Sequence, residues 1–208
     1  EKLSADHTIV RVEPGASYAA GDGGFQVNPE SKSDFEQLIS AVVDAHGKID
    51  TIIQGWPLAH GDVSDLESMT AAQKDSMAAT LHLAQALSGV GINPDLFLLS
   101  RDAYRIDGSE NGIQLAGAPV SGIGNVIELE FPNMRCVRVD LSAASETEIG
   151  MLAAEIEGGD DQVRLAYCEA DRYSERFVRL NEKAPAESLE YPDSENYLLD
   201  STSKGILD

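Results

Sequence analysis

Strand-like and helix-like stretches alternate along most of this chain, and their order constrains the fold more than any other feature of the sequence. The strand-like stretches are short and apolar, as expected for strands buried on both faces of a parallel sheet, and lie at 50–55, 95–100 and 134–141. The helix-like stretches carry apolar residues at helical spacing and lie at 31–47, 70–89, 117–131 and 145–159. Such an alternation favours helices packed on a parallel sheet. We therefore predict an α/β fold with a truncated doubly wound, mostly parallel sheet.

Three S/T-x-x-E/Q sequences indicate where helices begin, because the two side chains of such a capping box satisfy free amides of the first turn. They lie at Ser33–Glu36, Thr70–Gln73 and Ser145–Glu148. Each helix that follows has one apolar stripe: Phe35, Leu38, Ile39, Val42 and Val43 in the first, Met77, Leu81, Ala84 and Leu87 in the second, and Ile149, Leu152, Ala153 and Ile156 in the third. Three amphipathic helices, each next to a strand, fit a doubly wound sheet.

Two further segments contain extended runs on both sides of a turn sequence, which is typical of β-hairpins. In the first, Gly21-Asp22-Gly23-Gly24 separates two short arms. A phosphate-binding glycine loop would lead from a strand into a helix, whereas these glycines lead into Phe25-Gln26-Val27, so a turn is the better interpretation. In the second, the alternating run 163–167 is followed by a Glu-Ala-Asp turn and another alternating run. We expect this hairpin at the edge of the sheet.

The chain has 208 residues, enough for one domain or one domain with an appendage, and a net charge of −21. That charge repels phosphate backbones and anionic lipid headgroups, so nucleic acid and membrane surfaces are poor partners. No apolar run reaches the roughly 18 residues of a membrane span. Cys136 and Cys168 lie in predicted strands and outside any C-x-x-C pair, which indicates free thiols in a reducing, cytoplasmic compartment.

The sequence contains no strand–glycine turn–helix arrangement of the kind that holds a dinucleotide. Gly89–Pro94 follows a helical run, and Gly122–Ile127 lies inside one, where glycines more often allow close packing. Carbonyl reduction by a tyrosine also requires a lysine four residues later to lower the pKa of that tyrosine. The stretch from Arg105 to Met134 contains neither residue type. No such lysine follows any tyrosine of the chain: Tyr18, Tyr104, Tyr167, Tyr173, Tyr191 and Tyr197.

Other residues with reactive side chains also lack the partners that chemistry would need. No zinc-site spacing relates the four histidines, His7, His46, His60 and His82. His60-Gly61-Asp62 follows a predicted strand, where α/β proteins usually bind ligands, but a solvated loop histidine is the better interpretation. Ser121 lacks a nucleophile-elbow sequence, and the acid pairs Asp160-Asp161 and Glu128/Glu130 fit solvated faces. We therefore assign no catalytic, cofactor-binding or metal-binding residue, and no cofactor.

Six segments occur in a characteristic order: GFQVNP, DTIIQGWPL, LHLAQAL, DLFLLSRDA, APVSGIGNVIELEFPNMRCVRVDLS and DDQVRLAYCEADRYSERFVRL. Together they resemble the structural subdomain of the ketoreductase in modular type I polyketide synthases and related fatty acid synthases. The resemblance covers residues 8–180. Its most specific parts are GIGNVIELEFPNMRCVRVDL and the final hairpin.

In that family the ketoreductase is split into two halves. The resemblance implies that this chain is the half with a truncated Rossmann-like fold, which has no cofactor-binding or catalytic residues and is not an enzyme on its own. It would support NADPH-dependent β-keto reduction by the catalytic half. The implied partners are that catalytic half and the neighbouring dehydratase and enoylreductase domains of the same multifunctional polypeptide.

Because the chain begins at Glu1 rather than Met, we expect it to be a piece of a longer protein. We predict a ketoreductase structural subdomain over 1–180, a linker over 181–190, and over 191–208 a strand that leads into a following domain. ENYLLDS in that last segment resembles the opening strand of an enoylreductase domain. Two alternatives stay open: a fragment of a stand-alone NADPH-dependent short-chain dehydrogenase/reductase, or an independent protein-interaction module.

Overall fold

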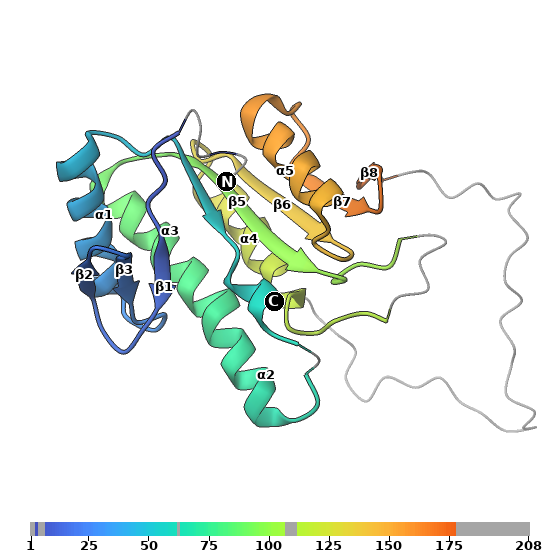
Figure 1. Cartoon of the computed structure of the whole chain (residues 1–208), viewed down its shortest axis with the longest axis horizontal. Coiled ribbons are helices and arrows are strands. Elements are labelled where there is room, and N and C mark those ends of the chain that lie inside the picture. The colour runs from blue at the N-terminus through green and yellow to red at the C-terminus, as the bar shows by residue number, and fades with distance from the viewer. Residues whose placement is uncertain (1–2, 4–6, 62, 107–111, 178–208) are drawn as a thin grey trace, which may run out of the picture. The chain divides into compact units, whose positions relative to one another are not determined.

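The computed structural model describes residues 3, 7–61, 63–106 and 112–177, and the chain up to Glu175 forms one compact unit. Within this unit lie a three-stranded sheet, in the order β1-β3-β2, and a five-stranded sheet, in the order β4-β5-β6-β7-β8 (Figure 1). The domain boundaries expected at residues 180 and 190, and the strand expected within 191–208, lie outside the described residues and remain predictions.

The small sheet contains the hairpin that the sequence predicted around Gly21–Gly24. Its strands β2 (Ala19–Gly21) and β3 (Gly24–Val27) pair antiparallel, and β1 (Val12–Pro14) runs parallel to β3 on the other side. Only glycine fits at Gly24, because its φ is 122° and an added Cβ would collide with the Arg11 carbonyl group. The chain before Val12 is not part of this strand.

The large sheet is mostly parallel, as predicted. Its strands β4 (Thr51–Gln54), β5 (Asp95–Arg101), β6 (Cys136–Leu141) and β7 (Arg164–Cys168) run in one direction. The predicted edge hairpin is confirmed, because β8 (Asp171–Ser174) pairs antiparallel with β7 at the end of the sheet. Every residue of β6 is buried, including the charged Arg138 and Asp140, as expected for a strand covered on both faces of a parallel sheet.

Helices cover both faces of this sheet (Figure 1). Helices α1 (Lys32–His46), α3 (Ala79–Val90) and α4 (Ala118–Glu130) share one apolar core with Leu96 and Leu98 of β5. Helix α5 (Glu146–Gly158) packs instead with Phe97 and Leu99, because successive residues of a strand point to opposite faces. This arrangement confirms the predicted α/β fold. No helix in the described part of the chain is long and apolar enough to cross a membrane.

Of the three predicted capping boxes, one is correct and two are wrong. Helix α5 begins with the predicted box, in which Ser145 and Glu148 cap each other's backbone amides. Helix α1 is capped two residues earlier than predicted, by Ser31, whose Oγ accepts a hydrogen bond from the Asp34 amide at 3.3 Å. The prediction at Ser33 was wrong because two overlapping sequences, 31–34 and 33–36, both have the form of a cap.

The second predicted helix starts earlier and is irregular. Helix α2 (Leu66–Gln73) begins after Asp65, which forms a box with Ser68. It continues through a π-helical turn, η2 (Lys74–Ala78), into α3. Hydrogen bonds in a π turn span five residues instead of four, so the buried face departs from the regular spacing assumed in the sequence. Of the predicted stripe, Ala84 and Leu87 are buried, whereas Met77 and Leu81 are exposed.

Candidate functional site

The carboxyl ends of the parallel strands are the first place to look for a site, because ligands of open α/β sheets bind there. Within that edge, the ligand lies at the point where the order of the strands reverses direction. In the described sheet, β4 to β7 simply follow one another, so these strands form no such switch point. Gly91 ends α3 in the left-handed conformation, and Gly122 and Gly124 lie inside α4. None of these glycines connects a strand to a helix as a phosphate-binding turn does.

A buried carboxylate lies at the carboxyl end of β6. Asp140 accepts hydrogen bonds from Ser100 Oγ at 2.6 Å, from the Ala103 amide at 3.0 Å and from the Tyr104 amide at 3.1 Å. Burial raises the pKa of Asp140, and these three hydrogen bonds oppose that shift. Because all the donors belong to β5 or to the loop that follows it, the carboxylate holds this loop against β6.

Ser121 has a partner that the sequence did not indicate. The phenolic O–H of Tyr104 donates a hydrogen bond to Ser121 Oγ, so the loop after β5 contacts the first turn of α4. At the same place an added Cβ on Gly117 would lie 2.8 Å from Ser100 Cβ, which requires glycine before α4. Among the described residues, no lysine or histidine forms a hydrogen bond with this serine–tyrosine pair.

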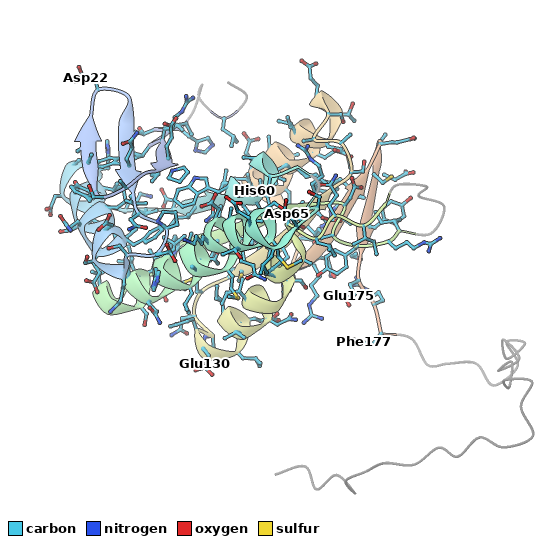
Figure 2. The ribbon with its side chains drawn as sticks, turned by 90° about the horizontal axis from the view of Figure 1, so that it is seen from below. Asp22, His60, Asp65, Glu130, Glu175 and Phe177 are labelled. Atoms are coloured by element: carbon cyan, nitrogen blue, oxygen red, sulfur yellow. The ribbon has the colours of Figure 1, made fainter. Side chains whose placement is uncertain are left out.

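His60 is not the solvated loop histidine that we expected from the sequence. Its Nε2 lies 2.8 Å from Asp75 Oδ2, and the two side chains are only 21% and 23% exposed. The pair joins the connection between β4 and α2, in which Figure 2 shows His60 and Asp65, to the π-helical turn η2. Asp62 lies outside the described residues. The described part of the chain contains no cluster of three metal-ligating side chains.

The acid pair Glu128/Glu130 is also more than a solvated face. Arg138 of β6 is buried and donates a hydrogen bond from Nη2 to Glu128 Oε2 at 2.6 Å. An added Cβ on Gly124 would lie 2.5 Å from Arg138 Cδ, so the helix packs directly on the arginine side chain. Glu130 is exposed at the end of α4 (Figure 2). Glu128 is likewise exposed, as expected, but its carboxylate also holds α4 to the sheet through Arg138.

A second ion pair, between the buried Glu155 and the partly exposed Arg172, links α5 to the edge hairpin. Glu155 accepts two hydrogen bonds from Arg172, at 2.9 and 3.2 Å, and one from Tyr167 Oη at 3.1 Å. Arg172 also donates to Asp160 at 2.8 Å, so Asp160 is paired rather than only solvated. Asp161 is exposed. No local sequence pattern indicates this network, because its members lie on different elements.

The two cysteines occupy strands β6 and β7, as predicted. Both are free thiols; Cys136 is buried and Cys168 is half-buried. Burial raises the pKa of the Cys136 thiol to about 12. Little thiolate forms at neutral pH with such a pKa, so this thiol is a poor nucleophile.

The outer face of α4 is the strongest candidate for an interaction surface. Ala118, Gly122, Val126 and Leu129 follow one another at helical spacing, and all four are exposed. Val126 is 48% exposed and Leu129 is 80% exposed. A continuous exposed apolar stripe of this kind often marks a protein–protein contact. We refer to these four residues as the α4 stripe. Sequence reasoning missed its outward direction, because apolar spacing does not show which side of a helix the sheet occupies.

Comparisons with known proteins point to one group of large enzymes. The model of the family described as "Beta-ketoacyl synthase-like, N-terminal" matches residues 1–156. The polyketide synthase GfsA of Streptomyces halstedii is 27% identical over 155 residues, which are 72% of this chain and 2% of that protein. The chain thus corresponds to a very small part of this relative.

Solved structures with the same fold include ketoreductases. The adenylation, ketoreductase and pseudo Asub structure of a keto acid-selecting NRPS module matches with a TM-score of 0.73 and 23% identity, over 83% of this chain and 15% of that chain. An N-terminal ketoreductase from the macrolactin assembly line matches at 0.60 and 15%, over 76% and 32%. The first ketoreductase of the tylosin PKS matches at 0.56 and 21%, over 72% and 30%. The resemblance drawn from the sequence is thereby confirmed at the level of the fold.

Proposed function

The chain belongs to the beta-ketoacyl synthase-like, N-terminal family, and from this premise we propose that it is the noncatalytic structural subdomain of a ketoreductase in a polyketide or fatty acid megasynthase. In this role it supports the NADPH-dependent reduction of a β-ketone on a carrier-protein-bound chain. The cofactor and the reacting groups belong to a separate catalytic half of the same polypeptide.

The observation that carries this proposal is the α4 stripe. Burying a Val or Leu side chain that is otherwise in water contributes about 1.5–3 kcal/mol, so a partner on this face would gain substantial stability from Val126 and Leu129. The small residues Ala118 and Gly122 allow a second backbone to come close, because the distance between packed helices depends on the side chains at the contact. A helix of the catalytic half is therefore a suitable partner.

The polar groups at the carboxyl edge of the sheet also fit a supporting role. Asp140 accepts hydrogen bonds from the Ser100 hydroxyl and from the Tyr104 amide, and Ser121 accepts one from the Tyr104 hydroxyl. His60 is engaged with Asp75. These contacts hold the connections after β4 and β5 in place. The same polar side chains would be needed to bind a substrate at this edge, and here they bond to other residues of the chain.

The first test is titration of this chain with NADPH in a calorimeter. We expect no binding tighter than a dissociation constant of about 100 μM, which corresponds to roughly −5.5 kcal/mol. We also expect no reduction of β-ketothioester surrogates. Tighter binding would contradict the proposal and favour a fragment of a stand-alone NADPH-dependent reductase.

The second test measures how tightly this chain associates with the catalytic ketoreductase half of the same polypeptide, produced as a separate protein. Leu129→Lys should weaken this association at least tenfold, whereas Leu66→Lys should leave it unchanged. The control is matched, because Leu66 is 79% exposed and Leu129 is 80% exposed, and the substitution is the same. Equal effects of the two variants would show that the α4 stripe is not the contact surface.

A further inference from the structure

A groove of about 850 Å³ separates the two sheets of the compact unit. One long side is the segment 8–12, which leads into β1, and the other is β4, the edge strand of the large sheet. Figure 1 shows the chain before β1 and the strand β4 beside each other. Apolar side chains of α1 and α3, including Leu38, Ile39 and Leu83, line the groove between them.

Among the described residues, no strand pairs with the groove side of β4. Within the described sheet β4 pairs with β5 alone, and the Asp50 carbonyl group accepts a hydrogen bond from the Asp95 amide at 3.0 Å. N–H and C=O groups of successive residues point to alternate edges of a strand. The amides and carbonyls of Thr51 and Ile53 therefore point away from β5, toward the groove.

The backbone of β1 turns toward the same groove. The Arg11 carbonyl group accepts a hydrogen bond from the Phe25 amide of β3 at 2.9 Å, so the N–H and C=O of the next residue, Val12, point away from β3. The Val12 carbonyl group accepts a hydrogen bond from Trp56 Nε1 at 3.2 Å. The indole of Trp56 thus links β1 to the groove, which β4 and the segment 8–12 border.

The charges around the groove differ from those of the whole chain. The protein has 36 acidic and 15 basic residues, yet the charged and titratable side chains that line the groove are His7, Arg11, His46, Lys48 and Asp50. Asp50 is already paired with Lys48 at 2.8 Å. With the histidines neutral, Arg11 and Lys48 outweigh Asp50 at this rim, in a protein whose net charge is −21.

We propose that this groove binds an extended strand of a partner polypeptide in which apolar and acidic side chains alternate. The partner backbone would pair with Thr51 and Ile53, as in other cases of strand addition to a free sheet edge. Its apolar side chains would face the groove floor, and its acidic ones would lie near Arg11 and Lys48, because successive side chains of a strand point to opposite faces.

Other occupants fit these observations less well. A small apolar molecule would leave the amides and carbonyls of β4 unpaired, and buried unpaired backbone groups are unfavourable. A second copy of this chain would bring an identical rim, so its basic side chains would face Arg11 and Lys48. Of these occupants, a strand-forming segment with acidic side chains alone would pair with the backbone of β4, cover the apolar lining and oppose the charges of Arg11 and Lys48.

The test uses fluorescence anisotropy with a labelled octapeptide of alternating Glu and Val. Eight residues are sufficient, because the four residues of β4 span about 13 Å at about 3.3 Å per residue. We expect saturable binding, at least tenfold tighter than that of an alternating Lys/Val octapeptide. A Glu/Val octapeptide with N-methylated amides should bind at least tenfold more weakly, because it cannot donate backbone hydrogen bonds. Exchange of the Thr51 and Ile53 amide hydrogens should slow when the unmodified peptide binds.

A pair of double variants tests the role of the rim. Arg11→Glu/Lys48→Glu should weaken binding of the Glu/Val peptide at least tenfold. Lys32→Glu/Lys74→Glu changes the net charge equally but does not touch the groove, since these lysines pair with Glu36 and Glu30 elsewhere. This control should bind as the unmodified protein does.

Several outcomes would overturn the proposal. One is the lack of saturable binding, and another is equal binding of the N-methylated peptide, which would indicate an apolar ligand without strand pairing. Equal effects of the two double variants on peptide binding would show that Arg11 and Lys48 do not contact the peptide. A dimer in sedimentation experiments that Arg11→Glu/Lys48→Glu dissociates would identify a second copy as the occupant instead.

Discussion

Alanine substitution at two glycines of the same helix, α4, should have opposite effects on stability. Alanine is favoured over glycine by about 1 kcal/mol in a helix interior. At Gly122 an added Cβ would meet nothing within 4 Å, so Gly122→Ala should raise the free energy of unfolding by up to about 1 kcal/mol. At Gly124 the same Cβ would lie 2.5 Å from Cδ and 2.9 Å from Cγ of Arg138.

Arg138 has little freedom to move away from that Cβ. Its side chain is only 4% exposed, and its guanidinium donates hydrogen bonds to the Val163 carbonyl group, to Asn125 and to Glu128. Overpacking of this kind costs about 1–3 kcal/mol, which equals or exceeds the gain in helix propensity. Gly124→Ala should therefore lower the free energy of unfolding by up to about 2 kcal/mol, and the two variants should differ by about 1–3 kcal/mol.

Urea unfolding followed by circular dichroism measures this difference. A change of 1 kcal/mol also shifts the melting temperature by about 2–4 °C for a chain of about this size. In an Arg138→Ala background the collision is gone, so Gly124→Ala should become stabilising there. Equal shifts of the urea midpoint for Gly122→Ala and Gly124→Ala would refute the close contact between α4 and Arg138.

Three further predictions concern the two buried glutamates and the end of the chain. Glu148→Gln should lower the free energy of unfolding by about 1–3 kcal/mol at pH 7. Burial opposes ionisation of Glu148, but hydrogen bonds from residues 142–145 outweigh it and lower its pKa. The loss should therefore be full above the unfolded-state pKa of about 4.3 and shrink as the pH falls through the folded-state pKa; a pH-independent difference in urea midpoints would contradict this. Arg172→Met should cost about 1–3 kcal/mol, because the buried Glu155 loses the hydrogen bonds from its partly exposed cation, and Arg172→Lys should cost less in the same assay. Removal of residues 191–208 should cost less than about 1 kcal/mol, since the compact unit ends at Glu175; a larger loss would assign these residues to the domain.

Local sequence patterns were enough to determine the order of the elements and the class of the fold. The apolar runs of β4, β5 and β6, both hairpins and the cap of α5 were predicted correctly, because each depends on residues a few positions apart. The same reasoning was wrong where two local patterns competed. The cap of α1 lies at Ser31 rather than Ser33, and the π-helical turn after α2 moved the buried face away from Met77.

Only the tertiary structure decided which side chains meet and which surfaces stay open. Ser121 meets Tyr104 across 17 positions, and His60 meets Asp75 across 15, so no local spacing could identify either pair. Whether the α4 stripe faces the sheet or the solvent depends on where the sheet lies, and an amphipathic pattern alone does not give the position of the sheet. The groove likewise exists because the segment 8–12 and the edge strand β4, about 40 positions apart in the sequence, lie beside each other over helices α1 and α3. Contacts of this kind follow from the packing of whole elements, whereas the elements themselves follow from the order of neighbouring residues.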